Sequence, residues 1–207
     1  MSKIERRNLF GQEARAEGEG ESRRIVGYGA VFYRRGDPGT QYQLWSGAVE
    51  RILPGAFDKT LKDDDIRGLF NHSPSLLLAR NTSGTMQLGV DARGLRYDMQ
   101  PGKTSTASDV IEYLDRGDVS GSSIGFRAVE VDWTEEEIEG VKIDVRNLIE
   151  IKLFDVGPVT FPAYTGTDAA MRSAQGLDEV RAEYDQRRDP KAAADRAARL
   201  RKLRIPA

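Results

Sequence analysis

A lone histidine limits the acid–base chemistry available to this 207-residue chain. His72 is that histidine, so multi-histidine metal sites and two-histidine catalytic arrangements are excluded within a single chain. It lies in the stretch FNHSPS, where a predicted strand ends in a polar loop, and reactive groups are commonly displayed at such positions. His72 is therefore either a general base for a nucleophilic hydroxyl or a partly exposed loop residue without a catalytic role.

The hydroxyl that best suits such a base lies in the stretch SGSSIGF, between a predicted helix and a long predicted strand. Ser123 is flanked there by small residues, which let the backbone approach a ligand closely and leave amide groups available to stabilise an oxyanion. Ser120 and Ser122 compete for the same role, but strand alternation places Ser122 on the face opposite Ser123. The alternative interpretation is an ordinary turn rich in glycine and serine.

Two carboxylates are candidates for the group that orients His72. Asp155 and Glu150 both lie in an otherwise apolar strand segment, and Asp155 interrupts the stretch KLFDVGPVTF. A buried carboxylate needs a compensating partner, and an imidazole that becomes cationic is such a partner. A solvated position at the edge of a sheet is the competing explanation for Asp155.

Composition excludes several other functions. The chain has no cysteine, and therefore no disulfide, no thiol nucleophile and no thiolate metal site. A formal net charge of -2 gives no electrostatic basis for nucleic-acid binding. No apolar run approaches the roughly 18 residues that suggest a membrane span, and the N-terminus lacks the apolar stretch of a secretory signal. We expect no metal, no other cofactor, and no binding to membranes or to specific nucleic acids.

The elements that must hold these residues are mainly strands. Mixed β-branched and aromatic residues predict strands, the turn DARG predicts a hairpin, and two apolar patterns at helical spacing predict short helices. The predicted strands cover residues 23–33, 42–52, 85–90, 94–100, 119–133 and 141–161, and the predicted helices begin near Pro54 and near Thr104. Many strands with few helices indicate a mainly β fold with peripheral helices, arranged as an antiparallel barrel or sandwich.

Three segments of the chain differ in character. Residues 1–23 are charged, contain several glycines and lack periodicity, which predicts a flexible arm. Residues 24–165 contain the predicted strands and helices and form the predicted folded domain. Residues 166–207 are rich in alanine, arginine and aspartate and are strongly basic from Arg187 onward. This composition predicts a helical or disordered extension that adds little to the core.

Several stretches, taken in order, resemble the signature motifs of the caudovirus prohead serine protease family. One such motif alone is weak evidence, but their succession covers the whole predicted domain and is specific. The matching stretches are GYGAVF, ERILPGAF, NHSPSLLLARNTSGTMQLGVDARGLRYDM, SGSSIGF and LFDVGPVTFPAY.

The resemblance implies catalytic roles for particular residues. The family's histidine and serine fall on His72 and Ser123. Its acidic third residue falls on Asp155, where the family more often has glutamate, so Glu150 stays an alternative. Two other departures are Gly157, where serine is common, and Ser122, where a larger apolar residue such as methionine is frequent. Backbone amides around residues 121–125, with Arg127 or Arg80, are candidates for stabilising an oxyanion.

The resemblance also implies a fold and a biological role. The expected fold is an antiparallel β-barrel like that of the herpesvirus assemblin proteases, and a homodimer is the expected assembly. Such enzymes act inside the procapsid in the host cytoplasm, where they cleave scaffold or the delta segment of the capsid protein, and process themselves. The basic extension then fits a removable segment that retains the protease in the procapsid.

Two alternative functions belong to other classes. A non-catalytic capsid-assembly or scaffolding protein would also use charged arms and a helical extension. Another hydrolase on the same barrel, such as an esterase, would use the same nucleophile. The common α/β-hydrolase form of esterase is disfavoured, because the sequence has no G-x-S-x-G motif.

Overall fold

The computed structural model describes residues 4–7, 13–138, 140–161 and 177–188. These residues fall into two units. One unit, within Ile4–Gln175, holds every described strand and the helices α1 and α2. The other contains the helix α4 (Leu177–Arg188), which lies in the segment predicted to be a helical or disordered extension. The rest of that extension, residues 166–176 and 189–207, is outside the described residues.

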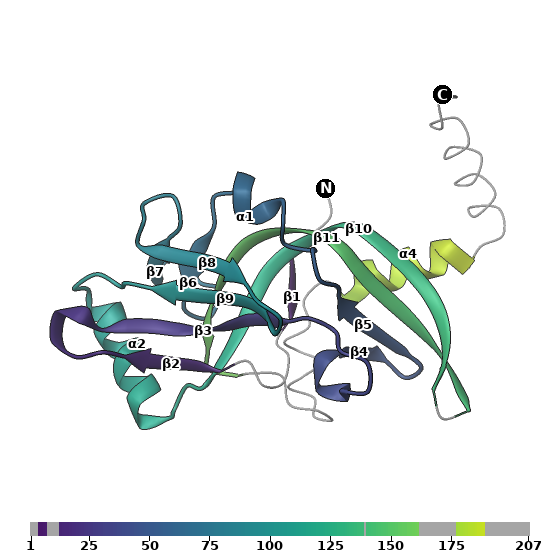
Figure 1. The fold of residues 1–207 in the computed structure, drawn as a ribbon, viewed down its shortest axis with the longest axis horizontal. Helices are drawn as coiled ribbons and strands as arrows, with labels where there is room; N and C mark the ends of the chain where they lie inside the picture. Colours follow the sequence, from purple (N-terminus) through teal and green to yellow (C-terminus); the bar gives the residue numbers. More distant parts are fainter. Residues whose placement is uncertain (1–3, 8–12, 139, 162–176, 189–207) are drawn as a thin grey trace. The chain divides into compact units, whose positions relative to one another are not determined.

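The strands of the larger unit form two sheets (Figure 1). The first sheet has seven strands, with the order β1-β10-β11-β5-β4 and with β6 joining β11 to β7. Its strands are β1 (Glu5–Arg7), β4 (Tyr42–Trp45), β5 (Ala48–Ile52), β6 (Arg67–Leu69), β7 (Leu77–Arg80), β10 (Gly121–Ile138) and β11 (Val141–Val159). The second sheet has four strands, in the order β2 (Ala14–Glu17), β3 (Arg24–Val31), β9 (Gly94–Met99) and β8 (Met86–Val90).

The prediction of a mainly β fold with few helices is confirmed, but the predicted closed antiparallel barrel is not found. Within the described ranges, the strand pairings leave both sheets open, and one isolated bridge between Glu13 and Gly121 links them. Two ladders are parallel, one between β11 and β5 and the other between β11 and β6. The partners of a parallel ladder are distant in sequence and share no turn, so no local signal reveals them.

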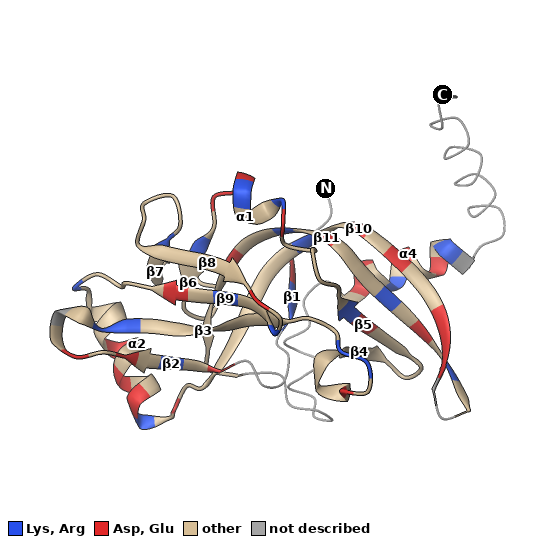
Figure 2. Cartoon of the chain, in the orientation of Figure 1, with Lys and Arg blue, Asp and Glu red and all other residues tan. Residues whose placement is uncertain are grey.

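A long antiparallel hairpin of β10 and β11 dominates the first sheet (Figure 1). Both strands were predicted from the β-branched and apolar residues that alternate along them. β10 continues past the predicted end at residue 133 to Ile138, so most of the acidic stretch TEEEIEG is paired with β11 and is not a connecting turn. The ladder contains irregularities, one of them between Gly125 and Phe126. β10 and β11 carry charges of both signs, as Figure 2 shows, and Arg51 of β5 pairs there with Glu136 at 2.7 Å.

The second sheet contains the predicted hairpin of β8 and β9, and its strand β3 bends at an irregularity between Tyr28 and Ala30. The predicted strand over residues 42–52 is instead two strands, β4 and β5. Gly47 makes this tight turn possible, because its φ of 80° is open to glycine at little cost. The resulting hairpin places β5 between β4 and β11.

The described residues of the larger unit contain two α-helices. α2 (Ser105–Arg116) is capped at its N-terminus by Thr104, whose side chain accepts a hydrogen bond from the Ala107 amide at 3.1 Å. The left-handed Gly117 stops it, as predicted. Where a helix was predicted to begin near Pro54, the chain forms a series of turns, and the short helix α1 (Thr60–Asp63) follows them. Two short 3-10 helices occur at Gly20–Ser22 and Pro38–Thr40.

The N-terminal residues differ from the expected flexible arm. β1 pairs with β10 in antiparallel register, and β2 pairs with β3. Neither segment shows the apolar alternation that predicts a strand, because β1 is built from the charged stretch ERR and β2 from ARAE. β1 is placed by pairing with β10, far away in the sequence, and β2 by pairing with β3, the next strand along the chain, and local propensity encodes neither position.

The apolar core of the larger unit is built from both sheets and α2. Fully buried side chains include Ile25, Leu95, Met99, Ile124 and Val156. Tyr97 is also fully buried, and its hydroxyl lies 2.7 Å from the Ser122 hydroxyl, which satisfies both polar groups inside the core. Among the described helices, none has the length and apolar character needed to cross a membrane.

Candidate active site

His72 lies just after β6, in a loop whose backbone is in an unusual conformation. Asn71 and His72 have φ angles of 53° and 56°, in the left-handed region that residues other than glycine rarely adopt. Hydrogen bonds to the end of β11 hold this loop. The Asn71 amide donates to the Pro158 carbonyl at 3.0 Å, and the Asn71 side chain donates to the Thr160 hydroxyl at 2.9 Å and accepts from the Thr160 amide at 2.8 Å. Backbone strain that the surroundings maintain is typical of functional sites.

Ser123 lies near the start of β10, directly opposite Gly157 of β11. Its hydroxyl oxygen is 2.6 Å from Nε2 of His72, and the residue is fully buried. The neighbouring Ser122 points to the other face and bonds Tyr97, as strand alternation predicted. Ser120 is exposed. The structure therefore brings one of the three competing serines to the histidine.

Asp155 lies on β11 opposite Gly125 of β10, and its Oδ1 bonds Nδ1 of His72. Gly125 makes room for this carboxylate. A Cβ atom at that position would lie 2.3 Å from Oδ2 of Asp155, a distance that real Cβ atoms do not show. The site therefore depends on a missing side chain as well as on the three polar ones.

The three side chains form a connected chain, Asp155–His72–Ser123, and are largely removed from water. The His72 and Asp155 side chains are only 8% and 11% exposed. A carboxylate at Nδ1 favours the tautomer that carries its proton there, which leaves Nε2 free to accept the serine proton. Geometrically this is the arrangement of an activated serine nucleophile with its base and an orienting acid.

The frame that holds the three residues is a single set of paired strands. β10 carries Ser123, β11 carries Asp155, and β6 leads into His72. β11 pairs with both others, since Asp155 lies opposite Arg67 of β6 as well as opposite Gly125 of β10. A rigid sheet therefore sets the distances between the three side chains.

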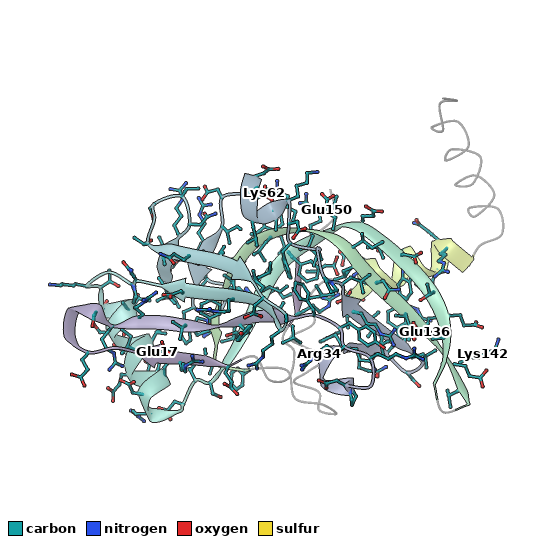
Figure 3. The ribbon with its side chains drawn as sticks, viewed as in Figure 1. Glu17, Arg34, Lys62, Glu136, Lys142 and Glu150 are labelled. Carbon is teal, nitrogen blue, oxygen red and sulfur yellow. The ribbon has the colours of Figure 1, made fainter. Side chains whose placement is uncertain are left out.

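The other candidate side chains have contacts of their own. Glu150 accepts a hydrogen bond from Lys59 at 3.1 Å, near α1, where Figure 3 labels it together with Lys62. Arg80 donates to both carboxylate oxygens of Asp65, at 2.8 and 2.6 Å. The guanidinium of Arg127 lies 5.4 Å from the centre of the Phe154 ring. Each of the three side chains therefore has a partner other than His72.

Sequence reasoning missed three contributors to the site. Asn71 and Thr160 fix the histidine loop, and Gly125 accommodates the acid. The signals were present in the motifs NHS and SSIGF, as an asparagine that tolerates a left-handed backbone and a glycine two residues after the serine. A single sequence does not show which polar or small neighbour has such a role.

Comparison with known proteins identifies the family of this chain. The family model described as caudovirus prohead serine protease matches residues 11–182. The prohead protease of Enterobacteria phage HK97 is 29% identical over 174 residues, which cover 82% of this chain and 69% of that protein. No solved structure matches the chain significantly. Because the family model spans most of the sequence, this chain belongs to the caudovirus prohead serine protease family.

Proposed function

We propose that this chain is a serine endopeptidase in which Ser123 is the nucleophile, His72 the general base and Asp155 the group that orients His72. Membership of the prohead serine protease family makes it a capsid-maturation protease. The observation that carries the residue assignment is the position of His72, with Nε2 at 2.6 Å from the Ser123 hydroxyl and Nδ1 bonded to Asp155.

In the proposed reaction, Nε2 of His72 accepts the Ser123 proton while the serine oxygen forms a bond to the peptide carbonyl carbon. His72 then gives that proton to the leaving amine as the carbon–nitrogen bond breaks, which leaves an acyl-enzyme. A water molecule, deprotonated by the same nitrogen, then attacks the ester carbon. His72 returns that proton to the Ser123 oxygen as the ester bond breaks, which releases the acid and restores the serine. Asp155 keeps the imidazole in the required tautomer and stabilises its cationic form, which matters because the site is largely dry.

The substrates that we propose are capsid-assembly proteins. They are the scaffold or the delta segment of the major capsid protein, together with the chain's own extension over residues 166–207. The proposed place of action is the interior of the procapsid, with a homodimer as the working assembly. Support for these substrates comes from the family and from the similarity to the HK97 prohead protease.

Intact-mass spectrometry of the purified chain over time tests the proposal. Wild type is expected to lose fragments of its extension, whereas Ser123→Ala stays whole. Ser120→Ala is the matched control, since Ser120 lies in the same motif but is exposed. If purified wild type is stable alone, the same comparison is made with the capsid protein added as substrate.

The outcomes separate clearly. Fragments from wild type and Ser120→Ala, but not from Ser123→Ala, support Ser123 as the nucleophile. Identical fragments from all three proteins remove Ser123 from the mechanism. Intact substrate with all three, in the presence of the capsid protein, contradicts the proposed substrate.

A further inference from the structure

The strand β1 lies along the edge of β10 next to Ser123. Its register is antiparallel, with Glu5 opposite Phe126 and Arg7 opposite Ile124. At the end of this ladder the Arg7 carbonyl oxygen lies 3.2 Å from the Ser123 hydroxyl oxygen. A backbone carbonyl therefore sits next to the proposed nucleophile, on an extended segment paired with the strand that carries it.

The side chains of β1 are held by a buried pair of charges from the body of the sheet. Arg7 donates to Glu50 of β5 at 2.7 Å, and Glu5 accepts from Arg146 of β11 at 2.8 Å. Arg7 and Glu5 also bond each other at 2.8 Å, and Arg146 bonds Glu50. Only 1% of Arg7 and 7% of Glu5 is exposed. We refer to these four residues as the charge cluster.

Half of the charge cluster exists without β1. Glu50 and Arg146 lie opposite each other in the parallel ladder of β5 and β11, so the sheet itself places them together. On an added strand, side chains two residues apart point to the same face, which matches a basic residue to Glu50 and an acidic residue to Arg146. Burying charges is unfavourable unless partners with good geometry are present, so this pair selects strongly by charge.

We propose that the edge of β10 next to Ser123 is the peptide-binding site of the protease, and that Glu50 and Arg146 select an arginine or lysine and, two residues before it, an acidic residue. The selected basic residue is the one whose carbonyl faces Ser123. Peptides bind there as an added strand, as in other sheet-edge recognition. Glu5–Arg7 of the chain itself occupies this site in the described structure. The proposal rests on Ser123 as the nucleophile.

While β1 occupies this site, the proposed nucleophile is closed to substrates. Ser123 is fully buried with β1 in place. The Arg7 carbonyl is a second acceptor for the serine hydroxyl, at 3.2 Å against 2.6 Å for Nε2 of His72. A hydroxyl has one proton, so each time it donates to Arg7 it is withheld from His72. Substrate binding therefore requires β1 to leave.

Peptide binding to a catalytically silent chain tests the proposal. The probe is a fluorescent peptide that contains Ile-Glu-Arg-Arg, the sequence of residues 4–7, and the control peptide contains Ile-Arg-Arg-Glu. The proteins are full-length Ser123→Ala and the same chain with Glu5→Ala and Arg7→Ala. The added pair of substitutions removes one charge of each sign and leaves Glu50 paired with Arg146, so the cluster stays balanced.

We expect fluorescence anisotropy to show the first peptide binding the triple variant more tightly than Ser123→Ala by about tenfold or more, because β1 no longer competes from a high effective concentration. The control peptide is expected to bind at least about 30-fold more weakly, because its first arginine would face Arg146 and its glutamate would face Glu50. Equal affinity of both proteins, or of both peptides, overturns the proposal. Since Ser123→Ala is inactive by design, failure here leaves the proposed catalytic residues untouched.

A second measurement is used if the triple variant does not fold, which the lack of a cooperative unfolding transition would reveal. Wild type is then assayed on its substrate with each unlabelled peptide added. Competitive inhibition by Ile-Glu-Arg-Arg and none by Ile-Arg-Arg-Glu supports the site. Inhibition by both or by neither contradicts it. Persistence of cleavage in Ser123→Ala would instead contradict the proposed nucleophile, whatever the peptides do.

Discussion

Gly125 and Asp155 face each other across the ladder of β10 and β11, and the space left by the glycine is filled by the carboxylate that bonds His72. The acid is thus positioned by contact with backbone on one side and with the imidazole on the other. This relationship explains why a glycine two residues after the proposed nucleophile belongs to the site although it has no chemistry of its own.

Replacing Gly125 is expected to damage catalysis through Asp155. In Gly125→Ala the new Cβ would lie 2.3 Å from Oδ2, so the carboxylate must move. We expect a loss of kcat of about 100-fold, as is typical of small displacements of catalytic groups. Gly89→Ala is the matched control, because a Cβ there meets no atom within 4 Å. Peptide-hydrolysis assays on both variants make the test, and equal activities would contradict the positioning of Asp155 by Gly125.

The two candidate acids are expected to behave differently. Asp155→Asn keeps the shape of the side chain but no longer favours the required tautomer, so kcat should fall by about 10³–10⁴-fold. Glu150 bonds Lys59 at the surface, so Glu150→Gln should stay within about twofold of wild type. Steady-state kinetics on a common peptide substrate distinguish them. A large loss with Glu150→Gln and none with Asp155→Asn would exchange their assignments.

The loop that carries His72 is expected to depend on the side chain of Asn71. Asn71→Gly keeps the left-handed backbone available but removes both side-chain hydrogen bonds to Thr160. We expect kcat to fall by about tenfold or more, because the imidazole is less firmly placed. Thr160→Val removes one of these two bonds and should show a smaller loss. Unchanged kcat in Asn71→Gly would mean that the backbone alone holds the histidine.

The charge cluster is expected to make stability depend on pH. Burial alone would raise the pKa of Glu50, but the charges and hydrogen bonds of Arg7 and Arg146 outweigh it and hold this pKa below its ordinary value. The stabilisation is therefore fully present above the unfolded pKa of glutamate, about 4.3, and is lost as the pH falls through the lower folded pKa.

Denaturant unfolding of wild type and Glu50→Gln between neutral and acidic pH measures this effect. At neutral pH the variant should be less stable by about 3 kcal/mol or more, because it leaves buried arginines short of a partner. The difference between the two proteins should shrink as the pH falls, since wild type loses the same charge by protonation. A difference that stays constant across the range would show that Glu50 is not charged in the fold.

Much of the fold followed from local patterns. The hairpin of β10 and β11, the hairpin of β8 and β9, and the helix from Ser105 to Arg116 all have clear periodicity or caps. The two parallel ladders of β11 and the pairing of β1 with β10 did not follow, because they join segments far apart in sequence without a turn. Charged residues in β1 predict exposure, and only the three-dimensional partners Glu50 and Arg146 explain their burial.

The proposed catalytic residues were suggested by residue type and by family resemblance together. His72 was the one available imidazole, and the resemblance singled out Ser123 among three serines. Residue spacing alone left Asp155 and Glu150 open, and the structure brings the former to the histidine. The supporting residues Asn71 and Gly125 could not be ranked from one sequence, since their effect comes through contacts with β11.

The central position of β11 has a consequence for timing. This one strand must pair with β10, with β6 and with β5 before Ser123, His72, Asp155 and Glu50 acquire their neighbours. His72 and Ser123 are separated by 51 residues, and His72 and Asp155 by 83, so these contacts form only after long loops close. In a nascent or partly folded chain, the proposed catalytic residues are therefore not yet assembled.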